Sequence, residues 1–167
     1  MSDPLKAVAD RNLRHSSLDP DISMEAHQAA NFESGVQPTP PEDKPPVNEE
    51  GKKMALAIAQ AADDRKAGNL IILQTGDVSY LADYFVIMTG FSKVQVRAIA
   101  NSIDSAVEDT FERLPLRTEG MSEGRWVLLD YGDVIAHIFM PDDREYYDLD
   151  AFWGHAERIE FVSTPAI

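Results

Sequence analysis

The residues best suited to chemistry lie in one stretch from Trp126 to Met140, WVLLDYGDVIAHIFM. It places a carboxylate, Asp130, and an imidazole, His137, among large aromatic and aliphatic side chains. Two apolar runs flank Gly132-Asp133, a pair that favours a two-residue primed turn in which glycine takes a positive φ. The stretch is therefore predicted to form a β-hairpin.

The turn predicts the register of the hairpin and the composition of its two faces. Side chains alternate across a strand. One face is then wholly apolar, with Tyr131 opposite Val134, Leu129 opposite Ala136 and Val127 opposite Ile138. The other face carries Trp126, Leu128, Asp130, Ile135, His137 and Phe139.

This second face has the composition of a binding surface. Burying an ionisable group without a partner costs several kcal/mol or shifts its pKa. We therefore expect the apolar face to be covered and the face with Asp130 and His137 to be at least partly open. Large aromatic rings beside polar groups are typical of interfaces. The alternative is structural: Asp130 bonds a neighbouring loop, and His137 is a core histidine with satisfied hydrogen bonds.

Two other places could in principle hold an anion or a metal ion. Gly90-Phe91-Ser92 lies at a predicted strand-to-helix turn, where free amides can bind phosphate, but the lysine and second glycine of a P-loop are missing. Asp130 with Asp133, or Asp142 with Asp143, could supply paired carboxylates for Mg²⁺. Asp133 lies in the predicted turn, however, and adjacent aspartates are typical of the first turn of a helix.

Nothing in the sequence identifies a catalytic residue, a metal site or a cofactor. His137 has no second histidine at ligand spacing, because His15, His27 and His155 lie in the N-terminal segment or after the last predicted helix. Cysteine is absent, and neither a G-x-S-x-G element nor a dinucleotide fingerprint occurs. We therefore expect no enzymatic activity.

Composition narrows the class of partner. The chain has 167 residues, is 44% hydrophobic and carries a net charge of -14, which argues against binding to phosphate backbones or anionic lipid. No direct nucleic-acid or membrane partner is expected. No segment resembles a signal peptide or is long enough to span a bilayer, so a cytoplasmic location is predicted.

Residues 1–51 differ from the rest of the chain. They are polar and acidic, and a proline-rich linker occupies their C-terminal part. Locked φ angles and missing amides disfavour packed structure, and few large apolar side chains offset the entropy of ordering. The linker prolines are Pro38, Pro40, Pro41, Pro45 and Pro46. We predict a disordered acidic extension.

Residues 52–154 are predicted to form one α/β domain, a mixed sheet of about five strands with helices packed on it. After this domain, residues 155–167 form a tail that is either a short strand or extended. The last predicted helix begins at Pro141 and ends at Gly154, with Tyr146, Leu149 and Trp153 on one side. The other predicted elements are a helix over 52–68 capped by Gly68, strands over 70–76 and 83–90, a helix from Ser92 to Leu114 ended by Pro115, and a short strand or loop over 116–120.

Three stretches, taken in this order and spacing, resemble the ribosomal silencing factors, the RsfS or Iojap family. They are Asp83–Ser92 (DYFVIMTGFS), Trp126–Phe139 (WVLLDYGDVIAHIF) and Arg144–Trp153 (REYYDLDAFW). The resemblance covers about Lys52 to Trp153. It leaves the acidic extension unexplained.

The resemblance implies a function without catalysis. Members of this family bind the large ribosomal subunit through ribosomal protein L-fourteen and block joining of the small subunit, which lowers translation in starvation or stationary phase. The fold it implies is nucleotidyltransferase-like, and homodimer formation is a further expectation. From the family motif and the second hairpin face, the expected partner-binding residues are Trp126, Asp130, His137, Phe139, Arg144 and Tyr147.

Two alternatives remain open from the residues alone. A nucleotidyltransferase-like enzyme would use the Gly90–Ser92 turn for phosphate and Asp130 as a metal ligand. A dimerisation module would use the aromatic hairpin face on a second copy of the chain.

Overall fold

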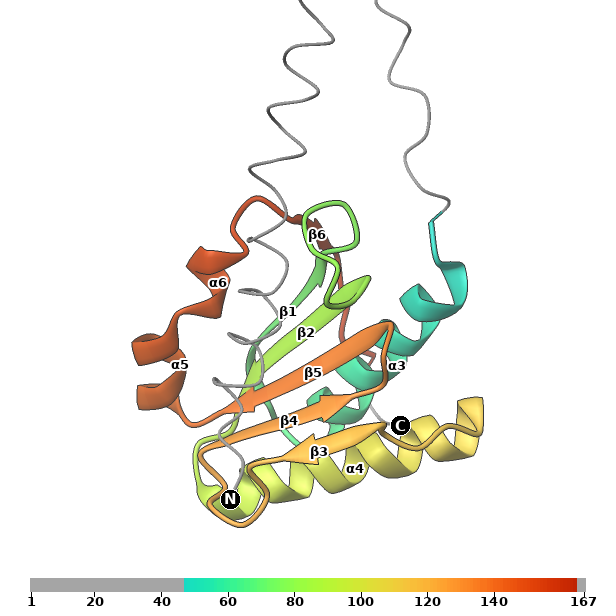
Figure 1. Ribbon diagram of the computed structural model, residues 1–167. Helices are drawn as coiled ribbons and strands as arrows, with labels where there is room; N and C mark the ends of the chain where they lie inside the picture. The colour runs from blue at the N-terminus through green and yellow to red at the C-terminus, as the bar shows by residue number, and fades with distance from the viewer. Residues whose placement is uncertain (1–46, 165–167) are drawn as a thin grey trace, which may run out of the picture.

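The computed structural model describes residues 47–164, which form a six-stranded mixed sheet with helices on both faces (Figure 1). The strand order is β3-β4-β5-β2-β1-β6, and only β2 and β5 are parallel neighbours. The predicted α/β class is confirmed. The elements are α3 (Glu49–Asp64), β1 (Gly68–Gln74), β2 (Tyr84–Thr89), α4 (Lys93–Phe111), β3 (Arg117–Glu119), β4 (Trp126–Asp130), β5 (Val134–Phe139), α5 (Pro141–Tyr147), α6 (Leu149–Phe152) and β6 (Glu157–Ile159).

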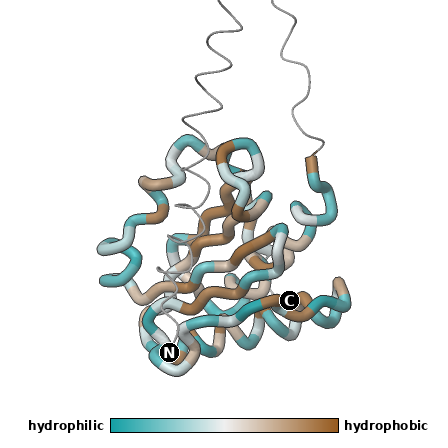
Figure 2. The backbone as a smooth tube through the Cα atoms, in the orientation of Figure 1, coloured by the Kyte–Doolittle hydropathy of each residue, from teal (hydrophilic) through white to brown (hydrophobic). Residues whose placement is uncertain are grey.

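The centre of the sheet is buried on both sides. Every residue of β2, β4 and β5 is buried. The continuous apolar run of β2 is typical of such a strand, whereas the hairpin strands β4 and β5 were expected to have one open face. Figure 2 shows the hydrophobic residues concentrated on these central strands, while much of the surrounding chain is hydrophilic. Strand β2 lies between β5 and β1, in the interior position that its sequence predicts.

Helices α3 and α4 cover one face of the sheet, which we call the first face (Figure 1). In α4, apolar side chains recur every three or four residues and form one buried stripe. This stripe packs on the apolar side of the hairpin in one continuous core. The stripe residues are Val96, Ile99, Ala100, Ile103 and Val107.

The hairpin has the predicted register. Leu129 pairs with Ala136, Val127 pairs with Ile138, and the Tyr131 N–H donates to the Val134 carbonyl over 2.9 Å. Gly132 takes the positive φ, +92°, that the primed turn requires. Turn chemistry and alternation are thus sufficient to place every side chain of this hairpin on its correct face.

Helix ends differ from the predictions because two residues other than glycine take the left-handed conformation. Helix α3 ends at Asp64 and Lys66 has φ 64°, so Gly68 is not the cap but the first residue of β1. Helix α4 ends at Phe111 with Glu112 at φ 54°, before Pro115 can act as the predicted stop. Leu114, the last residue of the predicted helix, therefore lies beyond α4 and is exposed.

The single helix predicted after the hairpin is instead two short helices. Asp148 takes a left-handed conformation (φ 45°), ends α5 and begins the turn into α6. The break rotates the two halves, so Tyr146 is 81% exposed although Leu149 and Trp153 are buried. The prediction that these three side chains share one face is therefore wrong. Beyond α6, β6 adds an edge strand antiparallel to β1.

Helix α3 begins at Glu49, three residues before the predicted start of the domain, and is capped by Asn48. The Asn48 side chain accepts a hydrogen bond from Gly51 N and donates to the carboxylates of Asp83 and Asp133. The extension predicted to be disordered lies almost entirely outside the described residues. Among residues 47–164, no helix is long and apolar enough to cross a membrane.

Candidate partner-binding site

The second face of the sheet carries the aromatic and ionisable residues of the hairpin, and it is not open as predicted. All six of its hairpin residues are at most 5% exposed. Helix α6 and the segment after it contribute Leu149, Trp153 and Ala156 to a second buried cluster on this face. The face can be covered because Asp130 finds partners within the chain and burial keeps His137 neutral.

Asp130 is bonded within the hairpin and to the neighbouring strand. Its Oδ1 accepts a hydrogen bond from the N–H of Gly132, over 2.8 Å, and Arg117 of β3 lies 3.6 Å from its Oδ2. The structural alternative for Asp130, a bond to a neighbouring loop, is therefore correct. The carboxylate stabilises the turn that sets the register of the two strands.

His137 is only partly satisfied. Its Nδ1 accepts a hydrogen bond from Trp126 Nε1, over 3.2 Å, so the neutral ring carries its proton on Nε2. Burial lowers the pKa of His137 to about 3 although nearby Asp130 acts in the opposite direction. The Nε2 atom is buried and has no hydrogen-bond partner, and the same holds for Nε1 of Trp153. Buried donors of this kind need an explanation.

Two series of aromatic contacts connect this buried pair of donors with the surface. In the first, Trp126 stacks on Phe139 with ring centroids 4.7 Å apart and contacts Tyr147 at 4.8 Å. Tyr147 in turn meets the exposed Tyr146 edge-on at 5.0 Å. The rings form a rigid column from the sheet to α5, because each is held by its neighbours.

The second series runs through α6. Phe85 lies 5.0 Å from His137 and 5.4 Å from Trp153, both edge-on. Trp153 then meets Phe152, which is 57% exposed, at 4.9 Å. Both series therefore meet at His137 and end in exposed rings on the short helices.

Arg144 holds the two short helices to the sheet. Its guanidinium donates to both carboxylate oxygens of Asp150, over 3.3 and 2.8 Å, and to Thr89 Oγ1 over 3.0 Å. It also donates to the carbonyl of Asn69. With a side chain only 12% exposed, Arg144 fixes α5 and α6 against the ends of β1 and β2.

Of the six predicted partner-binding residues, the structure brings Trp126, His137, Phe139 and Tyr147 into one cluster. Tyr147 is the half-buried, outermost member of this cluster. Asp130 and Arg144 lie beside it and hold its framework in place. Their role in binding a partner remains a prediction.

The Gly90–Ser92 turn is built as a helix cap. Ser92 Oγ accepts a hydrogen bond from Gln95 N over 3.0 Å, and the Gln95 side chain accepts one from Phe91 N over 2.8 Å, which together form a slightly shifted capping box. The N–H of Gly90 donates to a strand carbonyl. A Cβ on Gly90 would lie 2.7 Å from Val96 Cγ2, so close packing, not phosphate, accounts for this glycine.

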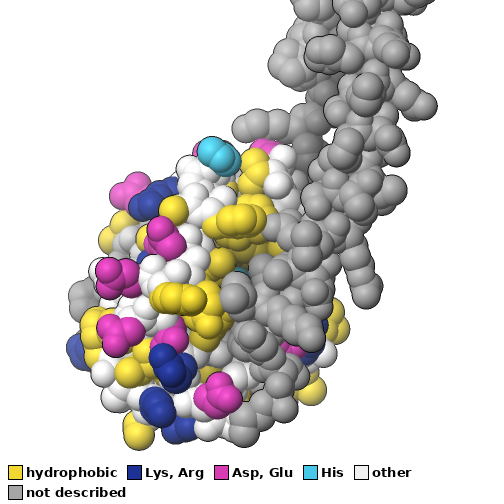
Figure 3. Space-filling view, turned by 60° about the vertical axis from the view of Figure 1, so that its left-hand side comes forward, with side chains coloured by type: hydrophobic (Ala, Val, Ile, Leu, Met, Phe, Trp, Pro, Cys, Tyr) yellow, Lys and Arg dark blue, Asp and Glu magenta, His cyan; other side chains and the backbone are white. Residues whose placement is uncertain are grey.

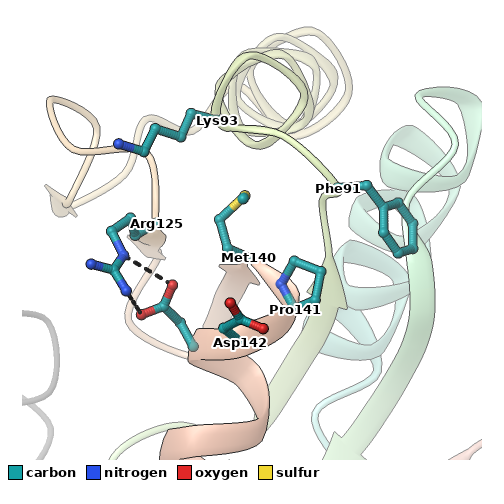
Figure 4. Close-up of a pocket in the computed structure, with 7 residues that line it drawn as sticks. Phe91, Lys93, Arg125, Met140, Pro141 and Asp142 are labelled. Atoms are coloured by element: carbon teal, nitrogen blue, oxygen red, sulfur yellow. Dashed lines mark hydrogen bonds and ion pairs between the residues drawn. The ribbon is translucent and has the colours of Figure 1, made fainter.

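A cavity of about 360 Å³ opens beside this turn, at the carboxyl ends of β2 and β5. Arg125 forms a two-point ion pair with Asp143 across its wall, at 3.1 and 3.2 Å. Figure 4 shows Lys93 on the opposite wall and the ring of Phe91 directed away from both cations. Cationic and anionic side chains both line the cavity, so its lining favours neither an anionic nor a cationic ligand.

The carboxylates considered for a metal ion do not converge. Asp130 is bonded to the turn, whereas Asp133 pairs with Arg113 at 2.9 Å, and Asp143 pairs with Arg125. Within residues 47–164, no group of three or more His, Asp or Glu side chains could hold a metal ion.

The residues that sequence reasoning missed are Trp153 and Phe152. Trp153 was assigned to one side of the last helix and Phe152 to no side, and neither was assigned to the aromatic cluster on the second face. The helix break at Asp148 decides their orientation, and an aspartate gives little sign of such a break. The signal in the sequence that could have indicated their place in the cluster is the density of large aromatic residues over 146–153.

Comparison with known proteins identifies the family. Residues 48–166 match the family described as ribosomal silencing factor during starvation, RsfS. The chain is 42% identical over 106 residues to ribosomal silencing factor RsfS of Bacillus subtilis, covering 63% of this chain and 89% of that protein. It is 31% identical over 137 residues to the chloroplastic protein Iojap of Zea mays, covering 82% of this chain and 59% of that protein.

Solved structures agree with this assignment. A crystal structure from Chromobacterium violaceum superposes with a TM-score of 0.58 and 34% identity, covering 71% of this chain and 94% of that one. A crystal structure from Bacillus halodurans superposes with a TM-score of 0.57 and 35% identity, covering 68% of this chain and 100% of that one. The resemblance read from the three sequence motifs is confirmed, and the chain belongs to the RsfS family of ribosomal silencing factors.

Proposed function

We propose that this protein binds the large ribosomal subunit through ribosomal protein L-fourteen and prevents the small subunit from joining, which represses translation under starvation or in stationary phase. The family match over residues 48–166 carries this proposal. A mouse relative, 26% identical over 89 residues, is named for mitochondrial assembly of the ribosomal large subunit, which supports the choice of subunit. The site of action is the cytoplasm.

The mechanism needs no active site. A rigid domain docked on the surface where the subunits meet blocks joining by its volume, so its affinity must come from a few well-packed anchors. Of the predicted residues, we assign direct contact with the partner to the half-buried Tyr147, and we assign Trp126, Asp130, His137, Phe139 and Arg144 to the framework that holds it in place. Tyr147 is the most accessible of the cluster, and the rings beneath hold it in one orientation.

Cosedimentation with purified large subunits tests the proposal. We expect Tyr147→Ala and Trp126→Ala to weaken binding by about 2 kcal/mol or more. Leu114→Ala, which removes an exposed side chain from the loop after α4, is the matched control and should bind as the unaltered protein does. Undiminished affinity of both folded aromatic variants would reject the assigned site.

The non-catalytic part of the proposal has a separate test. Titration calorimetry with Mg²⁺ and nucleoside triphosphates should give no binding heat, because the turn amides of Gly90 and Phe91 are already bonded. Saturable heat would favour the nucleotidyltransferase-like alternative.

Self-association through the same face is the second interaction that we propose. Light scattering of the protein and of Trp126→Ala should show a homodimer that the substitution weakens, because the aromatic cluster would be shared between copies. An unaltered dimer would place the self-contact elsewhere.

A further inference from the structure

A second hollow, of about 350 Å³, lies between the start of β1, the end of β2 and α5. Its walls include an aromatic ring and a proline, Phe91 and Pro141, and its charged residues are Arg144, Glu145, Asp148 and Asp150. It shares Phe91 and Pro141 with the cavity that holds Lys93 and Arg125. It is separate from the aromatic cluster assigned above.

The charge of this hollow is negative. Arg144 is neutralised by its two-point pair with Asp150. Glu145 and Asp148 are exposed, and neither forms an ion pair with any residue of the described chain. Two carboxylates therefore face the hollow without a counter-charge.

Only one of the two carboxylates has an evident local role. Asp148 makes no side-chain capping bond at the start of α6, but its backbone is left-handed, a conformation that aspartate adopts more readily than most residues other than glycine. Glu145 lies near the C-terminal end of α5, where the helix dipole disfavours negative charge.

Phe91 presents a fixed aromatic surface to the same hollow. Its side chain lies against Gly68, because a Cβ at Gly68 would come within 2.5 Å of Phe91 Cζ. Its backbone N–H donates a hydrogen bond to the side-chain oxygen of Gln95. The residue is nonetheless 59% exposed, so the ring packs on the glycine backbone while much of it remains accessible.

We infer that this hollow receives a lysine or arginine side chain from a basic segment of the protein partner. An aromatic ring beside uncompensated carboxylates binds a cationic side chain through cation–π and ionic contacts together. Figure 3 shows acidic, basic and hydrophobic side chains intermixed on the face turned forward. The uncompensated carboxylates of the hollow itself repel a phosphate backbone and disfavour a purely apolar segment.

The inference rests on the proposed function, because it supplies the chemistry of the partner at a contact additional to the aromatic cluster. It adds a charge requirement: Glu145 and Asp148 must be ionised for full affinity. It also predicts that part of the affinity falls as salt rises.

The first experiment measures affinity for purified large subunits by cosedimentation over a series of salt concentrations. We expect E145Q with D148N to bind about tenfold more weakly at low salt and to show a shallower salt dependence. The matched control is E108Q with D109N, which changes the same charge on exposed residues of α4 and should stay within about twofold. F91L should weaken binding about threefold.

The second experiment separates this inference from the proposed function. Hexalysine is titrated into the isotopically labelled full chain, and backbone resonances are followed by NMR. We expect shifts at Phe91, Glu145 and Asp148 that are lost in E145Q with D148N and kept in the α4 control. Shifts there without ribosome binding would retain the cation site and reject the proposed function.

Three results would overturn the inference. The first is ribosome binding by E145Q with D148N that equals the control. The second is tighter binding by that variant, which would mean that the hollow faces ribosomal RNA. The third is the absence of hexalysine shifts at the hollow in the unaltered protein.

Discussion

The two faces of the sheet are built from different chemistry. The first face is almost wholly apolar and is covered by the long helices α3 and α4. The second face packs aromatic rings around His137 and carries the short helices α5 and α6. His137 and Trp153 there each keep a buried donor without a partner. The first face therefore has the chemistry of a stabilising core, and the second is the face to which we assign the proposed recognition.

The largest expected effect is on the free energy of unfolding, and it comes from a substitution in the core of the first face. Ile103→Ala removes a fully buried side chain from the first face and should lower the free energy of unfolding by about 3 kcal/mol. Affinity of the folded fraction for large subunits should not change. Urea unfolding and cosedimentation measure the two quantities, and loss of binding by folded protein would break the proposed division between the faces.

A smaller effect is expected at the attachment of α5 and α6. Arg144→Lys cannot reproduce the two-point pair with Asp150 together with the bonds to Thr89 and Asn69, and should cost about 2 kcal/mol. The loss should appear as faster amide hydrogen exchange in α5 and α6, while α3 and α4 stay protected.

Arg125→Lys is the matched control for this substitution. Arg125 makes a similar two-point pair with Asp143, but its side chain is 59% exposed, so the loss of stability should be much smaller than that of Arg144→Lys. Equal losses in the two variants would contradict the role assigned to Arg144.

The second face should also make stability depend on pH. His137 has a pKa of about 3 in the folded protein and an ordinary value of 6.5 when unfolded. Between these values the unfolded chain binds a proton that the folded chain does not. Stability is therefore fully present above pH 6.5 and falls as the pH drops, by up to about 1.4 kcal/mol per pH unit.

Urea unfolding between pH 7 and pH 5 measures this slope. His137→Phe should reduce it, and substitution of the exposed His155 by Gln should leave it unchanged. An identical slope in His137→Phe would show that His137 is not held neutral by burial.

The smallest effect concerns the turn that sets the register of both faces. Gly132 has φ +92°, so Gly132→Ala should cost about 1 kcal/mol. Gly132→Asn should cost less, because asparagine tolerates positive φ better than alanine does. Thermal unfolding of both variants measures the difference, and equal losses would mean that φ strain is not the cause.

Much of the first face could be predicted from local rules. The turn at Gly132 and the strict alternation around it determine the register, and the apolar stripe of α4 identifies the covering helix. These signals depend on residues close in sequence, so each can be read without knowledge of the fold.

The second face could be predicted only in part. Its six hairpin residues were placed correctly, but their exposure was not, because Asp130 finds the amide of Gly132 and Arg117 on a neighbouring strand. Trp153 reaches this face through the helix break at Asp148, where the left-handed backbone is set by tertiary packing and not by a glycine. The exposure of these residues and the orientation of Trp153 thus depend on contacts between residues far apart in sequence, which sequence periodicity does not reveal.

The most direct test of the central claim is sucrose-gradient sedimentation of purified ribosomal subunits at a Mg²⁺ concentration that supports joining. The account predicts that the protein comigrates with the large subunit and depletes the joined particle, and that Tyr147→Ala does neither while Leu114→Ala does both. If the protein stays at the top of the gradient and joining is unaffected, the proposed silencing mechanism is contradicted.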